Sequence, residues 1–165
     1  MYPRKIRNFN AFVDGVSYFG TVQEGKLPEL KLATEGYRGA GMDGPVAIDM
    51  GQEAMQSELT FAEWHPALVK NFGRRERFVL RPAAMGEADF EADTFIATLG
   101  GRITVNDIGN SLKPGEDAPM KLTMEVDYYR LEKDGEVLLE IDIEKGKRVV
   151  GGVDQLGQLR AAMGV

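Results

Sequence analysis

Carboxylate pairs are the first groups in this chain that could do chemistry. Glu125 and Asp127 lie two residues apart, and so do Glu140 and Asp142. On a β-strand this spacing places both side chains on one face, where one could act as a general acid and the other as a base. A strand face in contact with water explains the same spacing without catalysis. We favour this second interpretation and expect no enzymatic activity.

His65 is the only histidine, so no metal cluster or catalytic pair of histidines can form within one chain. It could still be the base of a triad, but none of the serines lies in the Gly-x-Ser-x-Gly context of a nucleophile elbow. The absence of cysteine excludes disulfides, thiolate metal sites and thiol nucleophiles. We therefore expect His65 to cap, or to lead into, a helix that begins near Pro66.

Segments rich in glycine or arginine do not indicate a cofactor site or a nucleic-acid site. Residues 39–44 match the pattern GxGxxG, yet Pro45 and a strand-like segment follow where a dinucleotide site requires a helix. Residues 36–44 are better explained as an irregular loop. The basic cluster Arg74, Arg75 and Arg77 is too short for a nucleic-acid patch, and we expect it to pair with carboxylates. No cofactor and no metal is predicted.

The overall composition is typical of a single soluble domain. Hydrophobic residues make up 43% of the chain and the formal net charge is −6. The negative charge argues against tight nucleic-acid binding, because phosphates require a basic surface. No stretch approaches the roughly 20 apolar residues of a membrane span, and the short basic start lacks the apolar run of a secretory signal. We predict one domain over residues 1–165 that does not bind membranes.

The elements that must position the carboxylates are predicted to be strands, because apolar and polar residues alternate with period two. Residues 118–128 and 136–144 alternate in this way, and Asp134-Gly135 between them favours a tight hairpin. These two strands would present a row of carboxylates to water. Residues 94–105 form a third strand with a bulge or bend at Gly100-Gly101. Other strand candidates are 9–13 and 16–19 around Asp14-Gly15, and, more weakly patterned, 27–35, 46–50, 55–61 and 75–81.

Two segments favour helices. Residues 63–72 place Pro66 in a first helical turn and end before Gly73, and residues 153–163 carry apolar residues at spacings of three and four before Gly164. The predicted fold is therefore mainly β, a small antiparallel β-barrel or sandwich with a short helix and a C-terminal helix. Long strands leave open edges that oligomers can pair.

Several blocks of sequence, in order along the chain, resemble one family. They are Pro3–Tyr18, Glu35–Val46, Tyr128–Leu131 with Gly135, Glu140–Asp142 and Val153–Leu156. Together they are similar to the major tail tube protein of contractile-tailed temperate phages, the FII-type family, and to the tube proteins of R-type pyocins. The resemblance implies a structural protein, the subunit of an inner tail tube.

In such a tube, the resemblance implies, six subunits form a ring whose strands join neighbouring subunits around a channel, and the rings stack. The acidic strand faces become candidates for lining the lumen, where negative charge would let DNA pass without sticking; the candidates are Glu125, Asp127, Glu140 and Asp142. Candidates for contacts between rings come from the N-terminal arm, residues 1–10, and from a loop over residues 36–50. The residues are Arg4, Lys5, Arg7, Tyr37, Arg38, Met42 and Asp43.

The implied partners are further copies of the chain, the tail sheath protein, and the baseplate and tube-terminator proteins, with DNA passing without specific binding. The implied location is the virion, after assembly in the bacterial host cytoplasm. Three alternatives stay open: the tube of a tailocin through which no DNA passes, a secreted ring protein of the type VI kind, and a hydrolase that uses Asp or Glu pairs.

Overall fold

A computed structural model describes residues 2–109 and 112–165, and shows a mainly β chain with two short helices. All strand pairs are antiparallel. The elements are β1 (Lys5–Val13), β2 (Val16–Ser17), β3 (Val22–Lys26), β4 (Leu32–Tyr37), β5 (Val46–Gln52), β6 (Met55–Phe61), α1 (Pro66–Val69), β7 (Arg75–Met85), β8 (Ala92–Ile108), β9 (Met120–Lys133), β10 (Glu136–Asp142), β11 (Lys147–Val150), β12 (Val153–Asp154) and α2 (Gly157–Met163).

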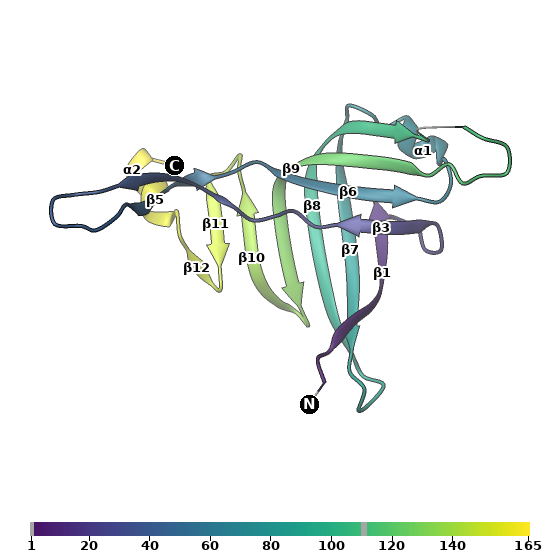
Figure 1. Ribbon diagram of the computed structural model, residues 1–165, viewed down its shortest axis with the longest axis horizontal. Helices are drawn as coiled ribbons and strands as arrows, with labels where there is room; N and C mark the ends of the chain where they lie inside the picture. The colour runs from purple at the N-terminus through teal and green to yellow at the C-terminus, as the bar shows by residue number, and fades with distance from the viewer. Residues whose placement is uncertain (1, 110–111) are drawn as a thin grey trace.

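Two long strands, β8 and β9, connect two layers of sheet (Figure 1). The long layer has the order β12-β11-β10-β9-β8-β7-β1-β2, and β6 adds to the other half of β9, with β3 beyond it. The change of layer occurs at a register shift between Gly100 and Gly101. A Cβ on Gly101 would lie 2.0 Å from the carbonyl oxygen of Glu125, so this close crossing requires glycine. The result is a bent, sandwich-like fold and not a closed barrel.

The core lies between these layers. Strand β6 alternates strictly, with Met55, Ser57, Leu59 and Phe61 buried. The facing strands contribute Phe78, Leu80, Ala97, Leu99, Met120, Leu122 and Met124. Burial of each large apolar side chain contributes about 1.5–3 kcal/mol, which makes this cluster the main source of stability.

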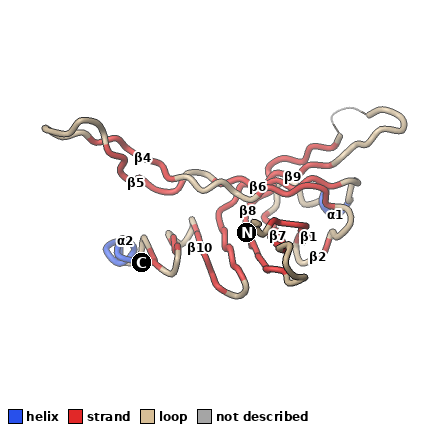
Figure 2. Tube along the Cα trace, turned by 60° about the horizontal axis from the view of Figure 1, so that its bottom comes forward, coloured by secondary structure: helices blue, strands red, loops and turns tan. Residues whose placement is uncertain are grey.

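The β4–β5 hairpin is the one large element outside this core. It forms its own two-stranded sheet. Figure 2 shows that it extends away from the rest of the chain. An isolated two-stranded hairpin is marginally stable in water, so contacts outside its own sheet must help to stabilise it.

Most of the predicted elements are confirmed. Both hairpin turns have the expected positive φ, 50° at Asp14 and 48° at Asp134, with glycine following in each. The bend at Gly100-Gly101 is present, and β6 covers residues 55–61 as predicted. The first helix has Pro66 in its first turn, and Gly164 ends the second in the left-handed conformation.

Several boundaries differ from the predictions. The predicted N-terminal arm is, from Lys5 onward, part of β1, because it pairs with β7. The predicted loop over 36–44 begins inside a strand, since Gly36 and Tyr37 end β4, and Val46 then begins β5. The strand predicted over 27–35 starts only at Leu32, and the sequence pattern missed the short strands β3, β11 and β12. Val153, predicted as helical, belongs to β12.

Candidate functional site

The long layer has one face that packs on the core and one that no other element covers. Along β9 and β10, Tyr129, Leu139 and Ile141 are buried, so their neighbours Glu140 and Asp142 lie on the uncovered face. The pairing confirms this, because Glu140 is opposite Arg130 and Asp142 is opposite Tyr128. An antiparallel sheet with one covered and one open face is suited to line a water-filled space.

The carboxylate of Glu140 is the centre of a polar network on this face. The Tyr128 hydroxyl donates a hydrogen bond of 2.9 Å to its Oε2, and the Lys147 ammonium donates to its Oε1. Arg130 lies 2.9 Å from Glu132 and 4.0 Å from Glu140. The Lys147 ammonium, helped by Tyr128, lowers the pKa of Glu140. Glu140 is therefore ionised, and Lys147 balances its charge. The sequence pattern had predicted a carboxylate free in water, and this prediction is wrong for Glu140.

The other predicted carboxylate pair lies elsewhere. Asp127 is the extra residue of the bulge, since Gly100 pairs with Tyr128 and Gly101 with Val126. Because of this bulge, Tyr129 and not Tyr128 continues the buried face. Asp127 forms an ion pair with Arg75, which confirms the predicted pairing for this member of the basic cluster, whereas Arg74 and Arg77 form no ion pair among the described residues. Glu140 and Asp142 therefore share the uncovered face, whereas Asp127 lies at the bulge, where its carbonyl oxygen accepts a hydrogen bond of 2.9 Å from the Ile143 N–H.

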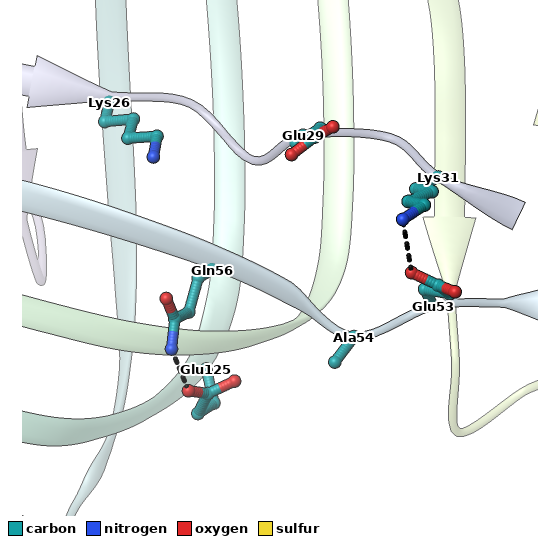
Figure 3. A pocket seen from close by; sticks show the side chains of 7 residues that line it. All are labelled: Lys26, Glu29, Lys31, Glu53, Ala54, Gln56 and Glu125. Atoms are coloured by element: carbon teal, nitrogen blue, oxygen red, sulfur yellow. Dashed lines mark hydrogen bonds and ion pairs between the residues drawn. The ribbon is translucent and has the colours of Figure 1, made fainter. Parts of the chain in front are cut away.

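Glu125 lies on the shorter layer, where the Gln56 amide donates a hydrogen bond of 2.6 Å to its carboxylate. Both residues line an open pocket of about 390 Å³ beside the start of the β4–β5 hairpin (Figure 3). The lining is polar and includes an ion pair of 3.7 Å between Lys31 and Glu53. The pocket's lining includes no serine, histidine or other nucleophile–base pair. It offers no arrangement for covalent or acid–base catalysis.

Two arginines lie on the uncovered face: Arg77, which was predicted to pair with carboxylates, and Arg81, which the sequence interpretation missed. Arg77 and Arg81 alternate with the buried Phe78 and Leu80 along β7, so they point away from the core. Neither has an ion-pair partner among the residues that the structure describes. The alternation of arginine with apolar residues over 77–81 was the signal for them. Arg77 and Arg81 therefore leave positive charge, without a carboxylate partner among the described residues, on the part of the uncovered face that β7 forms.

The basic N-terminal residues brace the connection between β7 and β8. Arg4 donates hydrogen bonds to the Asp93 carboxylate at 2.7 Å and to the Glu91 carbonyl oxygen at 2.9 Å. Arg7 pairs with Glu87 at 2.5 Å. Lys5 is exposed and pairs by backbone with Met85. These residues lie at one end of the long strands, where Figure 1 places the N-terminus beside the β7–β8 connection.

The β4–β5 hairpin has one mainly apolar face, on which Glu35 is the charged residue, opposite Ile48, and a second face that carries Asp49. Tyr37 pairs with Val46, and Ile48 and Met50 follow on the same side of β5. The exposed fractions of these four side chains lie between 44% and 58%. At the tip, Arg38 donates to the Met42 carbonyl oxygen at 3.1 Å, and Asp43 is exposed. An apolar strand face of this kind left in water marks an interaction surface.

The opposite face of the hairpin is fixed to the C-terminal part of the chain. Asp49 forms an ion pair with Arg148 on β11, whose Nε also donates to Gln155 at 2.7 Å. The backbone N–H of Gly51, together with Arg148, lowers the pKa of Asp49. Arg148 is only 5% exposed. This contact joins residues far apart in the sequence and had no local signal.

His65 leads into α1, as predicted, because it is the N-cap residue of that helix. Its side chain makes no cap hydrogen bond; instead Nε2 lies 3.1 Å from the Thr21 hydroxyl, and the ring packs edge-on against Tyr18 and Phe61. Within residues 2–109 and 112–165, no group of three or more acidic or histidine side chains could hold a metal ion. No helix in the same part of the chain is long and apolar enough to cross a membrane.

Comparison with solved structures supports the fold. A chain of the sheath–tube complex of a PVC extracellular contractile injection system, in the extended state, superimposes with a TM-score of 0.60 at 12% identity, covering 79% of this chain and 92% of that chain. A chain from the sheath/tube terminator of the same kind of system gives 0.57 at 11% identity, covering 80% and 98%. At these identities the likeness concerns architecture alone.

Comparison with known sequences shows the family. The chain is 32% identical over 170 residues to the tail tube protein of Escherichia phage P2, covering 99% of this chain and 98% of that protein. It is 32% identical over 144 residues to the major tail tube protein of Serratia phage KSP20, covering 86% and 84%. The family model of phage tail tube protein FII matches residues 3–164. The chain therefore belongs to the phage tail tube protein FII family, a family of structural tail tube subunits and not of enzymes.

Proposed function

We propose that six copies of this chain form a ring and that these rings stack into the inner tube of a contractile phage tail. The exposed apolar face of the β4–β5 hairpin supports this most strongly, in a chain similar over nearly its whole length to tail tube proteins. A surface of this kind is stable only when another subunit covers it. The open edge of β1, which β2 covers only at Phe12 and Val13, offers a second place for a neighbouring strand.

In this proposal the uncovered face of the long layer lines the channel, with Glu140 and Asp142 on its wall. The network around Glu140 neutralises much of the negative charge there and, among the described residues, Arg77 and Arg81 leave unpaired positive charge on the same face, so DNA would meet a wall of mixed charge. Lumen lining by Glu125 and Asp127 stays a prediction, because Asp127 lies at the bend and Glu125 on the other layer.

Contacts between rings would come from the two candidate regions. Tyr37, Arg38, Met42 and Asp43 lie at or near the tip of the β4–β5 hairpin, the part that extends farthest from the core (Figure 2). Arg4, Lys5 and Arg7 lie at the end of the long strands. The tail sheath, the tube terminator and the baseplate are the further partners that we propose.

We infer that the subunit assembles in the cytoplasm of the bacterial host and becomes part of the virion. A tailocin tube, without passage of DNA, is the second candidate, because solved neighbours include an injection system. Electron microscopy of intact particles that contain the protein separates the two, since only a phage carries a DNA-filled head.

The test is negative-stain electron microscopy of the concentrated protein, together with its mass in solution. Stacked rings or tubes with a central channel are expected. If the protein stays a compact monomer, purified baseplate is added as a nucleus. A monomer that does not polymerise on baseplates would contradict the proposal.

A further inference from the structure

The connection between β7 and β8 presents a single aromatic side chain to solvent. Phe90 is 96% exposed, at the tip of residues 86–91. The loop around it is held in place, because Arg4 binds the Glu91 carbonyl oxygen and Arg7 binds Glu87, and Asp89 accepts a hydrogen bond of 3.0 Å from the Glu91 N–H. An aromatic ring that is 96% exposed adds almost nothing to the stability of its own subunit. It is suited to be the anchor of an interface.

A pocket of matching size lies at the other end of the long strands. It occupies about 200 Å³ between the base of the β4–β5 hairpin, the β10–β11 turn and the segment before α2. Ile141, Ile143 and Leu156 supply its apolar lining. An apolar cavity of about 150 Å³ already accommodates benzene, so a phenyl ring fits this volume.

The charges around the ring and the pocket are complementary. Phe90 is flanked by Asp89 and Glu91, and the Glu91 carboxylate has no ion-pair partner among the described residues. The pocket is bordered by Lys147 and Arg148, which pair with Glu140 and Asp49, and by Asp142. Within the same described part of the chain, the buried Nη1 of Arg148 has no hydrogen-bond partner. Lys145 in the adjacent turn has no ion-pair partner among the described residues. Lys145 is therefore the cation that the Glu91 carboxylate of an entering loop could pair with.

The ring cannot reach the pocket of its own subunit. Phe95, close to the β7–β8 connection, pairs with Lys133 at one end of β9, whereas Asp142, beside the pocket, pairs with Tyr128 farther along it. The seven residues of β10 span roughly 20 Å between these ends. Figure 1 shows the β7–β8 connection and the β10–β11 turn at opposite ends of the sheet.

We propose that Phe90 of one subunit inserts into this pocket of a second copy in the adjacent ring. A contact between two different surfaces of the same chain does not close on a dimer; it closes a ring or continues along a stack, and the positions of the loop and the pocket at opposite ends of the strands favour the stack. The inference rests on the proposed tube and names a contact between its rings. Arg4 and Arg7 then act by holding the loop that carries Phe90.

Cross-linking tests this contact directly, because the native chain has no cysteine. The variant Ala88→Cys/Ile143→Cys keeps Phe90 and places one thiol beside it and one at the pocket. With a short bismaleimide, assembled protein should give a ladder of dimers, trimers and larger species in denaturing gels. The control Ala88→Cys/Phe19→Cys uses a site that is 79% exposed and outside the pocket, and should give no ladder.

A second variant separates the anchor from the fold. Phe90→Ala should leave the thermal unfolding midpoint unchanged, yet raise the protein concentration needed for tube formation about tenfold or more, as loss of an interface anchor does. Phe19→Ala is the matched control and should assemble normally. Tubes that form without the ladder, a ladder equal to that of the control, or a product that stops at the dimer would overturn the contact. Failure of the unaltered chain to form tubes, even on baseplates, would instead contradict the proposed function.

Discussion

Strands β5 and β6 follow each other in the chain and carry the same kind of alternation, yet their environments are opposite. Along β6, Met55, Leu59 and Phe61 are at most 2% exposed, whereas along β5 Val46, Ile48 and Met50 are at least 44% exposed. β6 pairs with both β3 and β9, and β5 pairs only with β4. The alternation of apolar and polar residues thus predicts a strand. Whether that strand stabilises the fold depends on whether other strands cover its apolar face.

The comparison implies a division of labour between the two regions. The sandwich holds the subunit together. In the proposed tube, the β4–β5 hairpin supplies apolar surface for contacts between subunits. The variants that follow test this division and are ordered by the expected loss in the free energy of unfolding of the isolated subunit.

Truncation in the core should have the largest effect. Leu59 is fully buried in the middle of β6, so Leu59→Ala should lower the free energy of unfolding by about 2–5 kcal/mol through lost burial and an unfilled cavity. Urea denaturation measures this. Leu159→Ala removes the same atoms from a side chain that is 57% exposed, and should change the value by less than about 0.5 kcal/mol. Equal losses would show that α2 contributes to the core.

The crossing between the layers should be nearly as sensitive. Gly101→Ala places a methyl group 2.0 Å from the Glu125 carbonyl oxygen, so the backbone must move. We expect a loss of about 1–3 kcal/mol in urea denaturation. Gly100→Ala is the neighbouring control, because its Cβ would make an ordinary contact of 3.4 Å with Tyr128. A tolerated Gly101→Ala would mean that the bend does not depend on this close approach.

The ionic network on the uncovered face should contribute less to the free energy of unfolding, and only at pH values where Glu140 is ionised. Lys147 holds the pKa of Glu140 below the ordinary 4.5, so its contribution is present above that value and lost as pH falls through the lowered pKa. Because Lys147 is partly exposed, Glu140→Gln should cost at most about 1 kcal/mol at pH 7 and reduce the loss of stability between pH 5 and pH 3. Urea titrations at several pH values measure both. Parallel curves for the two proteins would exclude this role of Glu140.

The β4–β5 hairpin should show the smallest effect on stability and the clearest effect on assembly. Ile48→Asp should change the free energy of unfolding by less than about 0.5 kcal/mol, because the site is exposed, and should prevent tube formation by placing charge on the apolar face. Ala47→Asp adds the same charge on the other face of the strand and should still assemble. Electron microscopy with matched denaturation curves decides this. Normal tubes from Ile48→Asp would remove the hairpin's apolar face from the interface.

By itself the sequence determined the mainly β class, both Asp-Gly hairpins, the bend at Gly100-Gly101 and the two helices, because these depend on local backbone preferences and on the period of neighbouring residues. The resemblance of its blocks to tail tube proteins added the family, which the full-length match confirms.

Only the tertiary structure decided which faces meet. The bulge at Asp127 changes the face that Tyr129 continues, Arg148 reaches Asp49 from 99 residues away, and Glu140 gains Lys147 from β11. The apolar residues of the alternating pattern are buried in β6 and exposed in β5. Register and cross-strand partners depend on distant segments, so no local pattern contains them.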